Sequence, residues 1–162
     1  MLLRAESLHA THQIAAAVAK SSRAGDVIVL AGEMGAGKTA FAQGFGAALG
    51  VVEPMTSPTF TLVHSHPVPG TKLVVHHADL YRLDTVGDVD DLALDELADF
   101  GGIVLVEWGD VVATVLGDHL LIRLEADDSD DDTARSIDVE AVGSTWSGRL
   151  ERLARELEPF RC

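Results

Sequence analysis

The stretch VIVLAGEMGAGKT, residues 27–39, decides how the rest of the chain is interpreted. It begins with the apolar run VIVLA, which is typical of a buried parallel strand. Residues 32–39 then match the pattern G-x-x-x-x-G-K-[ST] at every fixed position, and a helical pattern follows. A strand, a glycine-rich turn and a helix in this order predict a phosphate-binding loop and therefore a nucleotide site. The alternative is a glycine-rich turn that binds nothing.

The residue types in this loop suit the chemistry of phosphate binding. Glycines allow the backbone to wrap around a phosphate with its N–H groups pointing inward. We expect Lys38 to reach the β- and γ-phosphates and the Thr39 hydroxyl to take one position around Mg²⁺. A helix that opens at Lys38 would direct the positive end of its dipole at the anion. The predicted nucleotide contacts in the loop are Gly35, Ala36, Gly37, Lys38, Thr39 and Ala40.

The composition predicts one ordered domain over residues 1–162. Hydrophobic residues make up 47% of the chain, which is enough to build a core. The formal net charge of -14 argues against a broad nucleic-acid-binding face, because phosphate backbones are bound by basic patches. The same charge suits docking on a basic partner surface. The one cysteine, Cys162, excludes a disulfide or a cysteine-based metal site within the chain.

The sequence carries no evident targeting or membrane segment. Its start lacks the basic and apolar regions of a signal peptide. No apolar run approaches the ~18 residues of a membrane span. We therefore expect a cytoplasmic protein that does not associate with a membrane.

Hydrophobic patterns along the chain predict alternating helices and strands. A helix is expected from Ser7, as its N-cap, to about Arg23, and a second follows the loop and ends at Gly50. Further helices are expected over residues 88–100, 111–116 and 146–157. Strands are expected over 27–31, 59–63, 73–79, 103–106, 120–124 and, as an edge strand, 135–142, with a turn at 64–70 and a solvated loop at 126–132. This order predicts a P-loop α/β fold with a mostly parallel sheet, an antiparallel portion from the later strands, and helices on both faces.

Two carboxylates follow apolar strands and are candidates for the metal and the attacking water. Asp79 follows LVVHHA, and Glu107 follows IVLV. In a parallel sheet the carboxyl ends of the strands face the ligand crevice, so both side chains could approach the phosphates. Glu107 follows the cleaner apolar run and is the better metal candidate. For both residues the alternative is a structural carboxylate, such as one that caps a turn.

Several sequence blocks together resemble one known family. The blocks GEMGAGKT, SPTFTLV, HHADLYR and LVEW, which span residues 32–108, are similar to those of the TsaE family of bacterial ATPases. This family is required for making threonylcarbamoyladenosine in tRNA. The P-loop occurs in many NTPases, whereas the other blocks are far more specific. The resemblance implies binding of ATP and Mg²⁺ and hydrolysis of ATP.

The resemblance also implies roles for particular residues. It places Thr39 and Glu107 at the metal, and it makes Asp79 a carboxylate that is important for activity. The expected catalytic residues are therefore Lys38, Asp79 and Glu107. The resemblance implies that Thr11, in the first helix, lies near the nucleotide, although the local pattern alone favours an exposed helix residue. Arg135 resembles a basic position that touches the nucleotide, through a loose alignment.

The resemblance also implies a loop that contains Ser57, Thr59 and Thr61. This loop is expected to face the γ-phosphate side and to act as a switch. The chain departs from the family pattern at Glu33, where members often have Asp, and at Asp110, where many have Glu. Neither departure changes the expectation of nucleotide binding.

The resemblance implies partners as well. Members of the family work with a transferase subunit and its paralogue, so association with tRNA is expected to be indirect. Two other functions remain open from the residues. A small-molecule kinase would usually carry an arginine-rich lid, whereas Lys and Arg together number 12 here. A non-catalytic nucleotide-dependent binding module would not require acids at the ends of two strands.

Overall fold

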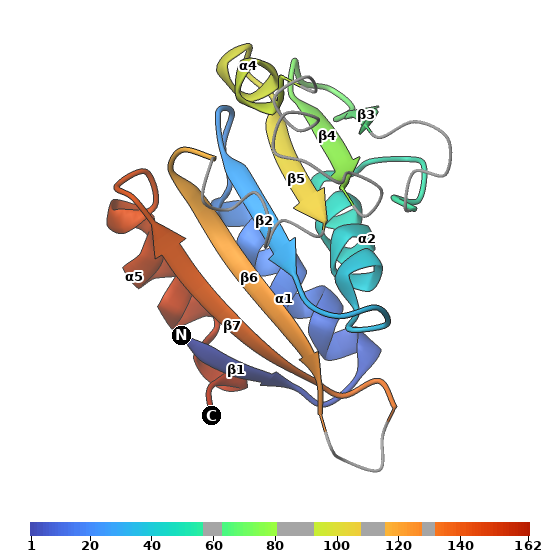
Figure 1. Cartoon of the computed structure of the whole chain (residues 1–162), viewed down its shortest axis with the longest axis vertical. Coiled ribbons are helices and arrows are strands. Elements are labelled where there is room, and N and C mark those ends of the chain that lie inside the picture. Colours follow the sequence, from blue (N-terminus) through green and yellow to red (C-terminus); the bar gives the residue numbers. More distant parts are fainter. Residues whose placement is uncertain (57–62, 81–92, 108–115, 128–131) are drawn as a thin grey trace.

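The computed structural model describes residues 1–56, 63–80, 93–107, 116–127 and 132–162 (Figure 1). Within them the chain forms one seven-stranded sheet in the order β1-β7-β6-β2-β5-β4-β3. Strand β2, Val27–Ala31, lies at its centre and is buried throughout. The other strands are β1 Leu2–Ala5, β3 Val63–Pro67, β4 Val74–Asp79, β5 Ile103–Glu107, β6 His119–Ala126 and β7 Arg135–Val142.

The central strands of the sheet are parallel and its outer strands are antiparallel. Strand β2 pairs in parallel with β5 and β6, and β4 pairs in parallel with β5. Strands β3, β7 and β1 join by antiparallel pairing. The predicted α/β class, with its parallel centre and antiparallel portion, is confirmed.

Helices pack on both faces of the sheet, most of them on the far side in the view of Figure 1. Helix α1, Leu8–Ser21, and helix α2, Lys38–Leu49, pack on one face, and helix α5, Ser147–Glu156, completes the same core. Helix α4, Leu94–Asp99, packs on the other face, and a 3-10 turn, Glu158–Phe160, follows α5. No helix in the described part of the chain is both long and apolar enough to cross a membrane.

Helix α1 is capped at its start and packs closely against α2 further along. The Ser7 side chain accepts a hydrogen bond from the Ala10 backbone N–H at 3.2 Å, which confirms the predicted N-cap. Further along, α1 crosses α2 so closely that a Cβ on Gly44 would lie 2.8 Å from the Cα of His12. A larger residue at Gly44 would therefore push α1 away from the helix that follows the P-loop.

Some sequence predictions are wrong at the sheet margins. The turn predicted over residues 64–70 is largely strand β3, which reaches Pro67 by pairing with β4; proline is tolerated because β3 is an edge strand. The strand predicted as an edge, β7, is interior because the unpredicted strand β1 pairs with it. Of the helix predicted over 88–100, the structure describes α4, and most of the helix predicted over 111–116 lies outside the described residues.

Candidate nucleotide-binding site

The predicted phosphate-binding loop, residues 32–39 and called the P-loop below, connects the central strand β2 to the start of helix α2. Helix α2 begins at Lys38, and its N-cap Gly37 has a φ of 104°, in the left-handed region that favours glycine. At the start of the loop, Gly32 passes against β6, where a Cβ would overlap the carbonyl oxygen of Leu124. The loop is thus held between the sheet and the first turn of α2.

Lys38 folds back over the loop that precedes it. Its ammonium group donates hydrogen bonds to the backbone carbonyls of Gly32, at 2.7 Å, and Glu33, at 2.8 Å. The side chain is buried in the protein, so its charge lies beside the loop rather than in bulk solvent. This places a cation where the sequence predicts the phosphates.

Glu107 lies beside Thr39, although 68 residues separate them in the sequence. The Thr39 hydroxyl is 3.4 Å from Oε2 of Glu107, and Glu107 is only 1% exposed. The contact arises because β5, which ends at Glu107, is the direct neighbour of β2 in the sheet (Figure 1). The sequence-predicted metal residues are therefore brought together.

Asp79 ends the next strand, β4, and its backbone lies opposite Glu107 in the parallel register. Aligned residues of neighbouring strands point to the same face, so both carboxylates lie on one side of the sheet. The acids at the ends of the two strands therefore lie on the same side of the sheet, and a shared crevice stays a prediction.

Mg²⁺ prefers carboxylate oxygens, and the Ser/Thr hydroxyl of a P-loop motif takes one further position around it. The described residues contain no cluster of three or more His, Cys, Asp or Glu side chains that could hold a metal alone. Mg²⁺ is usually bound by one or two carboxylates together with substrate phosphates, so Thr39 and Glu107 fit this ion.

Arg135, at the start of β7, binds the P-loop directly. Its Nε donates to the carbonyl of Ala36 at 2.9 Å, and its Nη2 lies 3.3 Å from the carbonyl of Gly35. Its Nη1 donates to the carbonyls of Asp132 and Ala134. The loosely aligned arginine therefore lies at the predicted site, where it contacts the backbone of the loop.

Thr11 is not the exposed helix residue that its local pattern favours. It is 1% exposed, and its hydroxyl lies 3.4 Å from the carbonyl of Ser7 within α1. A nucleotide contact by Thr11 stays a prediction. Other residues named from the sequence lie outside the described residues: Ser57, Thr59, Thr61, Trp108 and Asp110.

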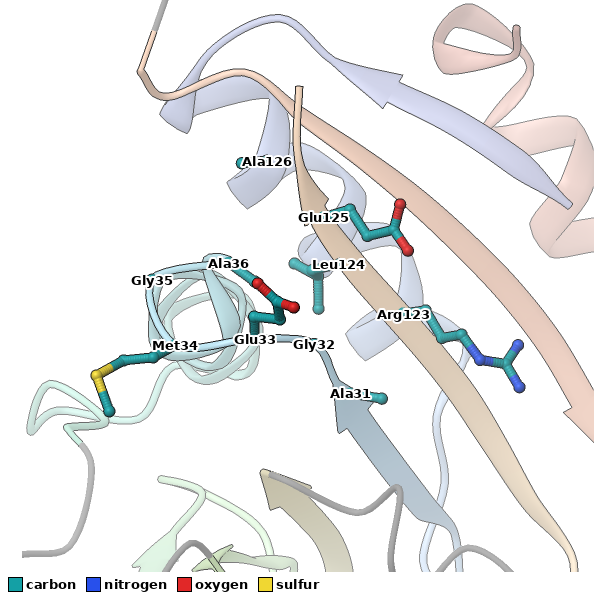
Figure 2. Close-up of a pocket in the computed structure, with 10 residues that line it drawn as sticks. All are labelled: Ala31, Gly32, Glu33, Met34, Gly35, Ala36, Arg123, Leu124, Glu125 and Ala126. Atoms are coloured by element: carbon teal, nitrogen blue, oxygen red, sulfur yellow. The ribbon is translucent and has the colours of Figure 1, made fainter. Parts of the chain in front are cut away.

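A cavity of about 650 Å³ opens between the P-loop and the end of β6 (Figure 2). Of the predicted site residues, Gly35 and Ala36 line it. Figure 2 shows Arg123 and Glu125 on β6 pointing away from the loop. The cavity therefore borders the predicted phosphate site, but Lys38, Thr39 and Glu107 do not line it.

Comparison with known proteins decides the family. The family model described as "Threonylcarbamoyl adenosine biosynthesis protein TsaE" matches residues 5–137. The chain belongs to the TsaE family. This is a family of proteins of tRNA threonylcarbamoyladenosine biosynthesis, as the resemblance of the sequence blocks predicted.

Individual TsaE relatives support the assignment over most of the chain. A TsaE protein of Streptomyces coelicolor is 39% identical over 134 residues, covering 80% of this chain and 89% of the relative. A TsaE protein of Bacillus subtilis is 35% identical over 148 residues, covering 90% and 88%. The crystal structure of Bacillus subtilis YdiB aligns with a TM-score of 0.78 and 31% identity, covering 96% of this chain and 94% of that one.

The sequence analysis missed one residue of this TsaE site. His77, on β4, contacts Glu107 through Nε2 at 2.7 Å, and it is fully buried. It was quoted within the block HHADLYR, but no role was given to it. The H-x-D spacing carried the signal, because residues two apart on a strand share one face and His77 therefore lies on the side of Asp79.

His66, on the neighbouring strand β3, has a pKa below its ordinary value. Burial lowers this pKa most, and the nearby His77 and His64 lower it further.

Proposed function

We propose that this chain binds ATP with Mg²⁺ and hydrolyses it, as a component of the machinery that forms threonylcarbamoyladenosine in tRNA. The observation that carries the proposal is the juxtaposition of Lys38, Thr39 and Glu107 around one end of the central strand. The family match supports the tRNA pathway, and the motif geometry supports the nucleotide.

In the proposed reaction, different residues of the chain bind the phosphates, hold the metal and orient the water. The backbone of Gly35, Ala36 and Gly37 and the ammonium group of Lys38 bind the β- and γ-phosphates. When bound, Mg²⁺ neutralises charge that develops on the phosphate oxygens. Thr39 and Glu107 would hold this ion, and Asp79, at the end of the neighbouring strand, would orient the attacking water.

The proposed partners are the transferase subunit and its paralogue that carry out threonylcarbamoyl transfer. The net charge of -14 supports docking on a basic surface. In this arrangement the chain contacts tRNA only through its partners, which is consistent with the scarcity of basic residues.

The test compares phosphate release and ATP binding in the wild-type chain, in Lys38→Ala and in Lys20→Ala. Lys20 is an exposed lysine in the last turn of α1 and serves as the matched control. We expect Lys38→Ala to lose ATP binding and hydrolysis while Lys20→Ala keeps both. Normal ATP affinity and turnover in Lys38→Ala would refute the proposed site. Consumption of ATP only when a small-molecule acceptor is added would favour the kinase alternative.

A further inference from the structure

The carboxylate of Glu107 is held between two side chains, one on each oxygen. Oε1 lies 2.7 Å from Nε2 of His77, and Oε2 lies 3.4 Å from the Thr39 hydroxyl. His77 and Glu107 are 0% and 1% exposed, so solvent does not compete for the contact between these two side chains. The two oxygens of one buried carboxylate thus have different partners.

The sheet register explains how His77 reaches Glu107. Strands β4 and β5 run parallel and side by side, with Asp79 opposite Glu107 and His77 opposite Leu105 (Figure 1). His77 is therefore two residues before Asp79 on the same face, which makes it a diagonal neighbour of Glu107. The spacing H-x-D therefore places His77 and Asp79 on the face of the sheet to which Glu107 also points.

Hydrogen-bond chemistry fixes the direction of this contact. A carboxylate that binds a metal is ionised and only accepts, so in a metal-binding Glu107 the hydrogen of this contact lies on Nε2 and His77 donates to Oε1. Within the described residues Nδ1 of His77 has no hydrogen-bond partner. In that part of the chain, the bond to Glu107 is therefore the ring's one polar contact, and it is charge-assisted.

We propose that His77 is a positioning residue, which holds Oε1 of Glu107 so that Oε2 faces Thr39 and remains available to Mg²⁺. The inference rests on the proposed function, because it assigns Glu107 to the metal. Without the imidazole donor the carboxylate can rotate about its terminal bond, and it must be ordered again each time the metal binds. Residues that hydrogen-bond to metal ligands typically contribute about 10–100-fold to metal affinity.

The competing explanation is that His77 only satisfies a buried carboxylate and stabilises the fold. The two explanations differ in what the loss of His77 changes. A structural partner alone would alter the melting temperature and leave the metal affinity of the folded protein unchanged. A positioning residue alters metal affinity, while nucleotide binding without metal stays near normal.

The experiment uses a matched pair of substitutions. His77→Gln places an amide N–H near the position of Nε2, whereas His77→Met is similarly unbranched and flexible but has no donor. The control is His76→Met, one residue earlier on the same strand, where the side chain bonds to Ser65 at 2.8 Å. His76 points to the opposite face of the sheet, so its loss should leave Glu107 in place.

Two affinities are measured for each folded variant. Mn²⁺ binding to the protein–ADP complex is followed by the electron paramagnetic resonance signal of free Mn²⁺. ADP binding is measured separately in EDTA. We expect His77→Met to lose about 10–100-fold in Mn²⁺ affinity. We expect His77→Gln to stay within about threefold of wild type, because it keeps the donor, and His76→Met to match wild type. ADP affinity in EDTA should be unchanged in all three.

The outcomes separate this inference from the proposed function. Wild-type Mn²⁺ affinity in folded His77→Met, combined with a loss in Glu107→Gln, would overturn the positioning role and leave the nucleotide site intact. Absence of ADP binding by the wild-type chain would overturn the proposed function itself. Should His77→Met fail to fold, ¹⁵N NMR of the His77 imidazole in the wild-type protein tests the positioning role instead. The Nε2 resonance of His77 should shift when Mg²⁺ is added to the ADP complex, and no shift would refute the proposal.

Discussion

The guanidinium group of Arg135 donates a hydrogen bond to the Ala36 carbonyl at 2.9 Å and so joins the antiparallel part of the sheet to the P-loop. The residues are 99 positions apart in the sequence. Arg135 also contacts the Gly35 carbonyl, so its side chain holds residues 35 and 36 of the P-loop in place. We expect Arg135→Gln to lower ADP affinity about tenfold, which corresponds to ~1.4 kcal/mol, because a loop without this brace must be ordered on binding.

Fluorescence titration with a labelled ADP analogue checks this expectation. Arg152→Gln is the control, because Arg152 is an exposed arginine of α5 that pairs only with Glu156 among the described residues. Equal ADP affinity in wild type and Arg135→Gln would contradict the bracing role.

Glu107→Gln should impair Mg²⁺-dependent hydrolysis more than it impairs nucleotide binding. A neutral amide keeps the shape of the side chain but cannot balance the charge of the metal. Asp79→Asn should behave similarly if its carboxylate orients the attacking water. Phosphate release and ADP affinity, measured in parallel, separate the two effects. A variant that hydrolyses ATP at the wild-type rate would make that residue structural.

The centre of the fold could be predicted from the sequence because its signals are local. The apolar run before Gly32 and the pattern after Lys38 define a buried strand and a helix without reference to the rest of the chain. The acids Asp79 and Glu107 were placed at one edge by a general rule for parallel sheets. The contact of Glu107 with Thr39 then followed from the order of the strands, because β5 lies next to β2.

The margins of the fold and the role of His77 depend on contacts between distant segments. Strand β1 is only four residues long, and it forms through pairing with β7. Strand β3 extends to Pro67 because β4 supplies a partner. The contact between His77 and Glu107 requires the pairing register of β4 with β5, which no local pattern specifies.

At the end of the sheet opposite the P-loop, Arg149 on α5 binds Asp26 with two nitrogens, at 2.6 and 2.7 Å. Asp26 is 1% exposed and directly precedes β2. We expect Arg149→Met to lower the free energy of unfolding by about 3 kcal/mol, because it removes the ion-pair partner of a buried carboxylate and leaves it the hydrogen bond from the Arg23 backbone N–H. Urea denaturation measures this loss. The double variant Asp26→Asn/Arg149→Met should recover part of it, and an additive double variant would show that the two residues act independently.

Asp118 should make stability depend on pH through the turn that begins α5. Backbone and side-chain hydrogen bonds from Ser144, together with those from Thr145, hold the pKa of the Asp118 carboxyl below its ordinary value of 3.8. Because the folded-state pKa is lowered, the stabilisation is complete above the unfolded pKa and is lost as pH falls through the folded one. Asp118→Asn should therefore melt at a lower temperature than wild type at pH 7, and the difference should shrink below pH 3.8. A difference that stays constant from pH 7 to pH 3 would contradict this.

Hydrolysis by the isolated chain should be slow and should rise when the transferase pair is present. P-loop enzymes that hydrolyse quickly use an arginine finger, worth ~10³–10⁵ in rate, supplied by the chain or by a partner. The sequence offers Arg82, which lies outside the described residues, and Arg135. The three guanidinium nitrogens of Arg135 already donate to backbone carbonyls of the P-loop and of the residues just before β7, so its contacts hold the loop in place.

A partner would then complete the site, and the charge of -14 would steer a basic partner surface toward it. ATP turnover is measured for the purified chain alone and during titration with the transferase pair, at low and at high salt. We expect stimulation that weakens at high salt, because screening shortens the range of electrostatic steering. Arg82→Ala serves as the internal comparison: if it removes most of the turnover of the isolated chain, the finger is supplied by the chain itself. Fast turnover alone, unchanged by the partners, would refute completion by a partner and leave the nucleotide site as the remaining conclusion.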